Sequence, residues 1–405
     1  MRKSIPELVG AILLVRLVVS AGVADAQERT PESASGADQP RLAGIFTGTR
    51  EVFAQPLHPL IDTIASGGWV GAGIGYDAPT PERWRVSSKG LVTLHQYWLA
   101  QFEGAYTGDR VEAVGYARTR SMKRLNFFGV GSDSEVTNRT SFTLRDPLIG
   151  LVASTRVAPA VSIGGRVEQM WPAVDAGEDP RYPSIEQRFT DTDAPGLSEQ
   201  PRFGRYEAFV QATVPPSDGW SFNQGGTYRV SYDIYDDQEL NQFDFRRLQL
   251  EGRHRFAMPQ PFHTLTIRGW LSSAEPLSGR EVPFFLQHTL GGTSNIRSVY
   301  DAPVGGDKTA ATLRAFSSHR YRDNHLFLLQ AEYRWNAWGP LETTVFAESG
   351  QVASRFSDLK LSRLQTSYGF SMSFMRGANA MARIDFGFGG DEGSRVFFDM
   401  GGWLR

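Results

Sequence analysis

Cysteine is absent from the 405-residue chain, so neither disulfides nor thiolate metal sites can stabilise it. A large excess of either charge is missing as well, because 42 Lys and Arg face 44 Asp and Glu, for a net charge of −2. Phosphate binding needs a basic surface, so nucleic acid is not expected as a partner. After residue 26 the chain also lacks an apolar run long enough for a transmembrane helix. A chain of this size must therefore be stabilised by its own packing or by a membrane.

The N-terminus has the pattern of a secretory signal peptide. Arg2-Lys3 form a short basic start, an apolar run extends from Leu8 to Val23, and Ala24-Asp25-Ala26 offers a cleavage site. Arg16 interrupts the apolar run, and it would be more costly still at the centre of a retained membrane anchor. We therefore predict a signal peptide at 1–26 and export of the chain.

Apolar and polar residues alternate with a period of two from residue 68 onward. The clearest example is 363–374, where one face is apolar or aromatic apart from Thr366 and the other carries Arg, Gln, Ser and Gly. Residues 325–335 repeat the pattern. Such runs exceed the usual globular strand of roughly five or six residues and match the roughly nine to eleven of a tilted strand that crosses a bilayer.

Sixteen candidate strands follow from this alternation, and the even number is typical of a closed bacterial barrel. They span 68–77, 86–95, 97–107, 111–122, 137–145, 148–157, 160–170, 203–214, 221–235, 243–257, 262–274, 324–335, 341–350, 363–374, 380–388 and 394–404. We predict an all-β, transmembrane antiparallel β-barrel over 68–405, located in the bacterial cell outer membrane. Residues 27–67 are predicted to be a linker, with a short helical segment left open in 44–65.

The two longest gaps between candidate strands are 171–202 and 275–323. If the chain starts on the periplasmic side, both gaps follow an odd-numbered strand and lie outside the cell, where barrels keep their long loops. The alternative architecture is a soluble β-sandwich or propeller, whose strands also alternate.

Several short segments occur in a recognisable order: "NFFGVGSDS" (126–134), then "PFFLQHTLGG" (283–292), "LRAF" (313–316), "RYRD" (320–323), "AEYRW" (331–335), "VFAESG" (345–350) and the closing strand "RVFFDMGGWLR". In this order they resemble the BamA/TamA superfamily of outer-membrane assembly and translocation barrels, also called the bacterial surface antigen family. The resemblance implies that the sixth extracellular loop, between strands eleven and twelve, folds back into the lumen. It also implies that a loop arginine there meets an acidic residue on strand thirteen.

Two arginines compete for the role of loop arginine. Arg297 has the family's short spacing after the Gly-Gly pair, whereas Arg314 has the better neighbours, because Leu313, Ala315 and Phe316 surround it and Arg320, Arg322 and Asp323 follow. We favour Arg314 and predict its acidic partner to be Glu348, which stands where the family has Asp, with Glu332 as a second partner. Neither motif keeps the family's glycine. The alternative is that 312–323 is a solvated extracellular loop.

The resemblance implies a non-enzymatic function. Such barrels insert other barrels, or move polypeptides or lipids, through a lateral opening between the first and last strands. The glycine-rich segment "GGWVGAGIGYD" (67–77) is expected to be a loosely paired first strand at that opening. Only 27–67 separates the signal peptide from this strand, which is too short for a periplasmic POTRA domain, so we expect a short form without POTRA domains.

The expected partners are outer-membrane lipids, unfolded outer-membrane protein clients or POTRA-containing assembly proteins. A loop-occluded, porin-like channel is the alternative function. An outer-membrane hydrolase is disfavoured because none of the seven histidines has a catalytic spacing. No catalytic residue, metal site or cofactor is predicted.

Overall fold

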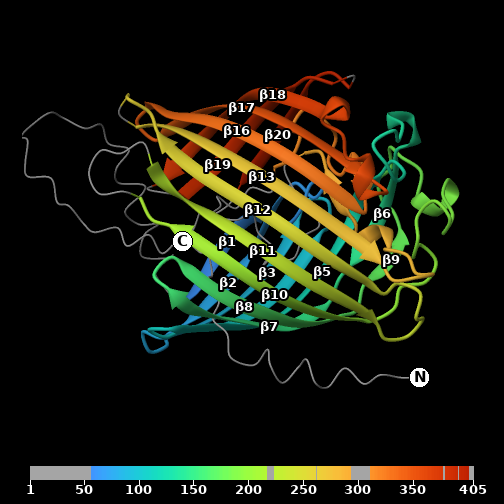
Figure 1. The fold of residues 1–405 in the computed structure, drawn as a ribbon, viewed down its shortest axis with the longest axis horizontal. Coiled ribbons are helices and arrows are strands. Elements are labelled where there is room, and N and C mark those ends of the chain that lie inside the picture. The colour runs from blue at the N-terminus through green and yellow to red at the C-terminus, as the bar shows by residue number, and fades with distance from the viewer. Residues whose placement is uncertain are drawn as a thin grey trace, which may run out of the picture.

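The computed structural model describes residues 56–216, 223–260, 262–292, 311–376, 379–390 and 392–400. Sixteen antiparallel strands form the wall of a nearly closed barrel, each hydrogen-bonded to the next (Figure 1). The wall strands are β1 (Leu57–Thr63), β2 (Val70–Ala78), β3 (Trp84–Thr93), β4 (Trp98–Thr107), β5 (Val111–Phe127), β7 (Leu148–Ala158), β8 (Val161–Met170), β10 (Phe203–Val214), β11 (Asn223–Asp237), β12 (Phe245–Ala257), β13 (His263–Pro276), β16 (His325–Trp338), β17 (Leu341–Ala353), β18 (Gln365–Arg376), β19 (Asn379–Phe388) and β20 (Arg395–Met400).

Four short strands lie outside this wall. They are β6 (Thr140–Arg145), β9 (Ala173–Ala176), β14 (His288–Leu290) and β15 (Tyr321–Asp323). The helical elements of the described residues are single 3-10 turns: η1 (Val136–Asn138), η2 (Ile185–Gln187), η3 (Phe284–Leu286), η5 (Phe356–Asp358) and η6 (Leu361–Arg363). No helix in the described part of the chain is long and apolar enough to cross a membrane.

The predicted number of wall strands is right, but one predicted member is wrong and one wall strand was missed. Residues 137–145 were expected in the wall, whereas β6 pairs with the end of β5, from Ser121 to Phe127, and with β9. β5 pairs with β7 only from Val111 to Arg118, so this long strand continues past its wall partner and forms a bulge with β6 between Met122 and Leu125. The missing member is β1, which lies within the predicted linker and pairs with β2. Pro59 fits there because β1 is an edge strand in the pairing, where a missing N–H is tolerated.

The alternation of the sequence corresponds to the two faces of the wall. On β18 the aromatic and Met side chains of Tyr368, Phe370 and Met372 are exposed on the outside, while Ser367 and Ser371 are fully buried inside. An apolar outer face with a polar interior is the arrangement of a transmembrane barrel, because lipid contacts the outside. A soluble sandwich or propeller is excluded because all sixteen wall strands belong to one sheet that curls into a nearly closed barrel.

The long connections gather at one end of the barrel, on the right in Figure 1, where β6 and β9 are labelled. These connections join β5 to β7, β8 to β10 and β13 to β16, so each follows an odd-numbered wall strand. The predicted strand positions eleven, twelve and thirteen correspond to β13, β16 and β17. The connection between β13 and β16 contains the β14–β15 hairpin and enters the barrel.

Candidate functional site

The long connection between β13 and β16 turns into the lumen at the Gly-Gly pair. Gly291 and Gly292 have φ values of 114° and 81°, which L side chains rarely adopt. The Thr312 N–H donates to the Gly292 carbonyl (2.8 Å), and the Gly291 N–H donates to the Thr312 carbonyl (3.1 Å). The motif that begins at Leu313 therefore follows the Gly-Gly pair directly in space, although it is distant in the sequence. Arg297, the competing loop arginine, lies outside the described residues.

Arg314 is completely buried and is surrounded by carboxylates from three wall strands. Its Nε donates to Glu348 Oε1 of β17 at 2.8 Å. One terminal nitrogen donates to Glu332 Oε1 of β16 at 2.7 Å, and the other donates to Asp385 Oδ1 of β19 at 3.2 Å. The guanidinium carbon also lies 3.5 Å from the centre of the Phe346 ring, on the same strand as Glu348. The planar guanidinium thus uses its fork of donors to join the loop to three different strands.

The backbone around Arg314 is fixed to the wall as firmly as its side chain. The Arg314 N–H donates to Glu348 Oε2 (2.6 Å), and the Ala315 N–H donates to Ser367 Oγ of β18 (2.9 Å). On β19, a Cβ at Gly387 would stand 2.1 Å from the Arg314 carbonyl oxygen, so only glycine allows this approach. We refer to Arg314, Glu348, Glu332, Asp385 and Gly387 as the loop lock.

The motif lacks the glycine of the resembled family, and the structure shows where the unusual backbone conformation falls instead. Leu313 has a φ of 45°, whereas Ala315 is not among the residues with positive φ. Leu313 and Phe316 are buried in one cluster with Trp270, Leu290 and Tyr321. This cluster anchors the loop against the inner wall, so the loop is packed inside the barrel and is not a solvated extracellular segment.

The remaining residues of the predicted motif serve a second group of contacts at the rim. Arg320 pairs with Glu392 in the β19–β20 connection and donates to Ser134 Oγ (2.8 Å). The Arg322 carbonyl accepts from the Gly131 N–H at 2.8 Å. The "NFFGVGSDS" segment (126–134) therefore contacts the loop through Ser134 and Gly131.

Arg322 differs from Arg314 in having no carboxylate among the described residues. It is 1% exposed, donates to the Phe284 carbonyl, and lies 5.5 to 5.8 Å from the ring centres of Phe127, Phe142 and Phe284. Burial without an opposite charge lowers the pKa of Arg322 to about 9. Burial also raises the pKa of the neighbouring Asp323, whose carboxylate accepts from Ser354 at 3.0 Å.

The structure brings together most of the predicted site residues, and it adds Gly387 and one acidic residue that the sequence reasoning missed. Glu348 and Glu332 both contact Arg314, whereas Arg320, Arg322 and Asp323 belong to the rim contacts. The missed acidic residue is Asp385. Its strand was predicted at 380–388, and the same alternation that placed Glu348 inside the lumen could have placed Asp385 there too.

Three solved barrels resemble the structure. Each match covers 85% of this chain: BamA from Haemophilus ducreyi lacking POTRA domains 1-3 at 13% identity (TM-score 0.52, 69% of that chain covered), CdiB from Escherichia coli at 10% (0.56, 62%) and CdiB from Acinetobacter baumannii at 10% (0.51, 59%). In sequence, no protein-family model matches, and no match to a curated protein is found. At these identities the comparison concerns the fold. The chain therefore has the transmembrane barrel fold of the BamA/TamA-type proteins that its sequence resembles.

Proposed function

We propose that this barrel assists the insertion or translocation of proteins or lipids at the bacterial outer membrane, without covalent chemistry, by opening laterally between β1 and β20. The observation that supports this proposal most directly is the seam between these two strands. Every other pair of neighbouring wall strands is joined by a backbone ladder, but β1 and β20 do not pair as strands within the described residues. The Thr63 hydroxyl of β1 donates to Asp399 Oδ1 of β20 at 2.5 Å, so the two edges still face each other.

A seam without a backbone ladder is the part of the wall that opens at the lowest cost. Each ladder hydrogen bond contributes roughly 0.5 to 1.5 kcal/mol, so a full strand pair would add several kcal/mol that the described residues of this seam do not supply. Two strand edges that do not pair with each other over the described residues also form a template to which an incoming strand can add. The glycine-rich strand is not at the seam, because it is β2, and a Cβ at Gly73 would stand 1.9 Å from the Gly90 carbonyl of β3. Its glycines therefore serve close strand packing, which corrects the expected role of 67–77.

The loop lock supports the same proposal from inside the barrel. Its carboxylates come from β16, β17 and β19, so it connects the loop to the C-terminal side of the wall, next to β20. The seam can then open while this side of the wall keeps its shape. The proposed partners are outer-membrane lipids and unfolded outer-membrane protein clients, delivered by POTRA-containing assembly proteins.

A disulfide across the seam tests the proposal. Because the chain has no cysteine, Thr63→Cys with Asp399→Cys introduces one defined pair at side chains already in contact. In cells that depend on this variant, oxidation should cause loss of other barrels from the outer membrane or altered lipid asymmetry, and reduction should reverse it. Proteomics of the outer membrane would identify protein clients, and an assay of surface-exposed phospholipid would identify lipid movement.

The matched control is a disulfide between strands that already pair. Val210→Cys with Val230→Cys joins directly opposed, outward-facing positions of β10 and β11 and should leave activity unchanged. If the oxidised seam variant supports the same protein and lipid composition as the reduced one, lateral opening is wrong.

A further inference from the structure

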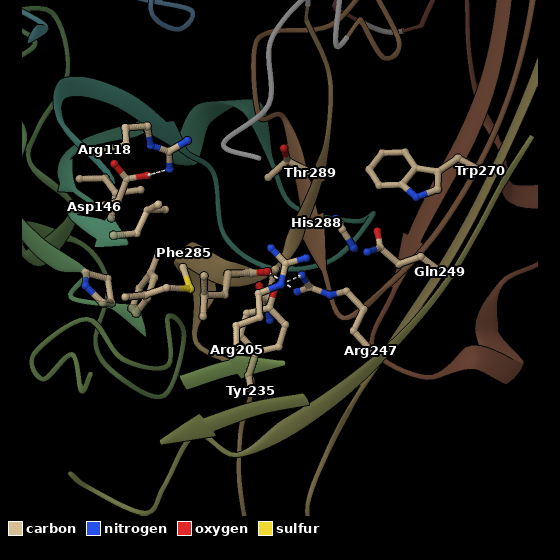
Figure 2. A pocket seen from close by; sticks show the side chains of 16 residues that line it. Arg118, Asp146, Arg205, Tyr235, Arg247, Gln249, Trp270, Phe285, His288 and Thr289 are labelled. Atoms are coloured by element: carbon tan, nitrogen blue, oxygen red, sulfur yellow. Dashed lines mark hydrogen bonds and ion pairs between the residues drawn. The ribbon is translucent and has the colours of Figure 1, made fainter. Parts of the chain in front are cut away.

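A cavity lies inside the barrel between the inward loop segment η3–β14 and the wall strands β5 to β13. Figure 2 shows three arginines around it, Arg118 of β5, Arg205 of β10 and Arg247 of β12, with Asp146 at one side. Its volume of about 70 Å³ exceeds the roughly 10 to 15 Å³ that one water needs. The cavity is separate from the loop lock, since no residue of the lock lines it.

The positive charge of Arg205 is neutralised by two carboxylates, Glu168 and Asp233. Arg205 donates to Glu168 Oε2 at 2.9 Å and to Asp233 Oδ1 at 2.6 and 2.8 Å. The other oxygens of these two acids are also occupied, because Tyr116 donates to Glu168 at 2.5 Å and Gln249 donates to Asp233 at 3.3 Å. These carboxylates are therefore already used and leave little for the two remaining arginines.

Arg118 shares a single carboxylate with a second arginine. Its Nη2 lies 3.1 Å from Asp146 Oδ2, while Arg120 donates to both oxygens of Asp146 at 2.6 to 2.8 Å. The Nε and Nη1 atoms of Arg118 are buried and have no hydrogen-bond partner among the residues that the structure describes. One carboxylate therefore faces two guanidinium groups, and the unused donors belong to the arginine that lines the cavity.

Arg247 has no carboxylate within ion-pair distance among the described residues. It donates to the Tyr235 hydroxyl at 3.1 Å and to the Leu286 carbonyl, while its buried Nε has no partner in the described part of the chain. Its side chain is 5% exposed. A buried cation left without an opposite charge costs several kcal/mol, and neutral acceptors or water recover only part of that cost.

We propose that this cavity binds a small oxyanion of the phosphate class, held by Arg118 and Arg247. Two guanidinium groups with unused N–H donors match the several acceptor oxygens of such an anion, and charge-assisted hydrogen bonds of this kind are about twice as strong as neutral ones. The occupied site ties the η3–β14 segment of the loop to the opposite wall, because the Leu286 carbonyl already accepts from Arg247. The same phosphate chemistry has two sources, a free anion or a lipid headgroup.

Stability measured at constant ionic strength tests the site without any client assay. The full chain is folded into neutral phosphatidylcholine vesicles, and urea unfolding is followed by tryptophan fluorescence while inorganic phosphate replaces chloride. A ligand that binds only the folded state lowers the equilibrium constant of unfolding by a factor of 1 + [L]/Kd. Phosphate at ten times its Kd should therefore lower this constant about tenfold. Arg247→Gln and Arg118→Gln should each abolish most of this dependence.

The control variant is Arg229→Gln, which removes another inward-facing arginine that pairs with Glu207 and does not line the cavity. It should keep the full phosphate response. If inorganic phosphate has no effect but phosphatidylglycerol vesicles stabilise the wild type more than the Arg247→Gln variant, the oxyanion is a lipid headgroup. Equal stability in phosphate, chloride and anionic lipid would overturn the proposal and leave a water-filled cavity, and so would an unchanged phosphate response of both cavity variants.

Discussion

Arg314 and Arg322 are two buried arginines of one loop, and they are held in opposite ways. Arg314 contacts three carboxylates from three wall strands, whereas Arg322 lies among three phenyl rings and donates to one carbonyl. Both side chains are almost completely inaccessible to solvent. Burial alone therefore does not distinguish a charge that joins the loop to wall carboxylates from one that is enclosed by aromatic rings of β5, β6 and the loop. The partners do.

Replacing Arg314 should have the largest effect, because its loss leaves Glu348, Glu332 and Asp385 close together inside the barrel. Arg314→Met is expected to destabilise the folded barrel by about 3 to 5 kcal/mol, the usual cost of breaking a buried ion network from one side. Urea unfolding in phosphatidylcholine vesicles measures this difference. A loss below about 1 kcal/mol would show that the lock does not stabilise the barrel.

A charge exchange between Arg314 and Glu348 is a poor test of the same contact. An acidic side chain at position 314 would still face Glu332 and Asp385, so an arginine at position 348 would compensate only one of three repulsions. The comparison between single neutral replacements is sharper, because each one removes a charge without adding a new one.

The acids of the lock should differ in the size of their effect. Glu348 is 1% exposed and accepts from the Arg314 side chain, the Arg314 N–H and Gln330 (2.7 Å), so Glu348→Gln should cost about 2 to 3 kcal/mol. Glu332 is shared with Arg334 at 2.9 Å and is partly exposed, so Glu332→Gln should cost only about 1 kcal/mol. The same unfolding experiment ranks the two, and the reverse order would mean that Glu332 is the principal acid.

Gly387 tests the backbone part of the lock. In Gly387→Ala the new Cβ would stand 2.1 Å from the Arg314 carbonyl oxygen. Because this oxygen belongs to the backbone, the loop itself must move away from the wall. We expect the substitution to destabilise the barrel by about 1 to 3 kcal/mol. Conductance in planar bilayers should rise as the loop loosens, which also addresses the channel alternative. Gly269→Ala is the control, because its Cβ would meet no atom within 4 Å. Equal conductance of both variants and the wild type would contradict a loop held closed by this contact.

The sequence predicted the parts of the fold that depend on local pattern. Period-two alternation identified β18 and placed Glu348 in the lumen, and the order of the motifs identified the loop that enters it. Two wall strands were misassigned for a physical reason. β1 is short and contains Pro59, so it lacks a strand signal, while β6 has a normal strand pattern but pairs above the rim.

Only part of the loop lock was predicted from the sequence, because the lock depends on contacts between distant segments. Alternation states which side chains point inward, but not which of them a loop from a distant part of the chain will reach. Asp385 and Gly387 belong to the lock because the loop backbone passes β19, and no periodicity reports that approach. The cavity arginines were missed because Arg118 and Arg247 resemble any other inward-facing polar residue of a barrel strand.

Arg322→Met should have the smallest effect and completes the comparison. Methionine fills similar space among Phe127, Phe142 and Phe284 and leaves no carboxylate unpaired, so stability should change by less than about 1 kcal/mol in either direction. Because burial lowers the pKa of Arg322, the unfolded chain binds more protons than the folded one above about pH 9. The wild type should therefore gain stability relative to the variant between pH 8 and about 10. A loss as large as that of Arg314→Met would mean that the aromatic rings hold this cation as firmly as carboxylates hold the other.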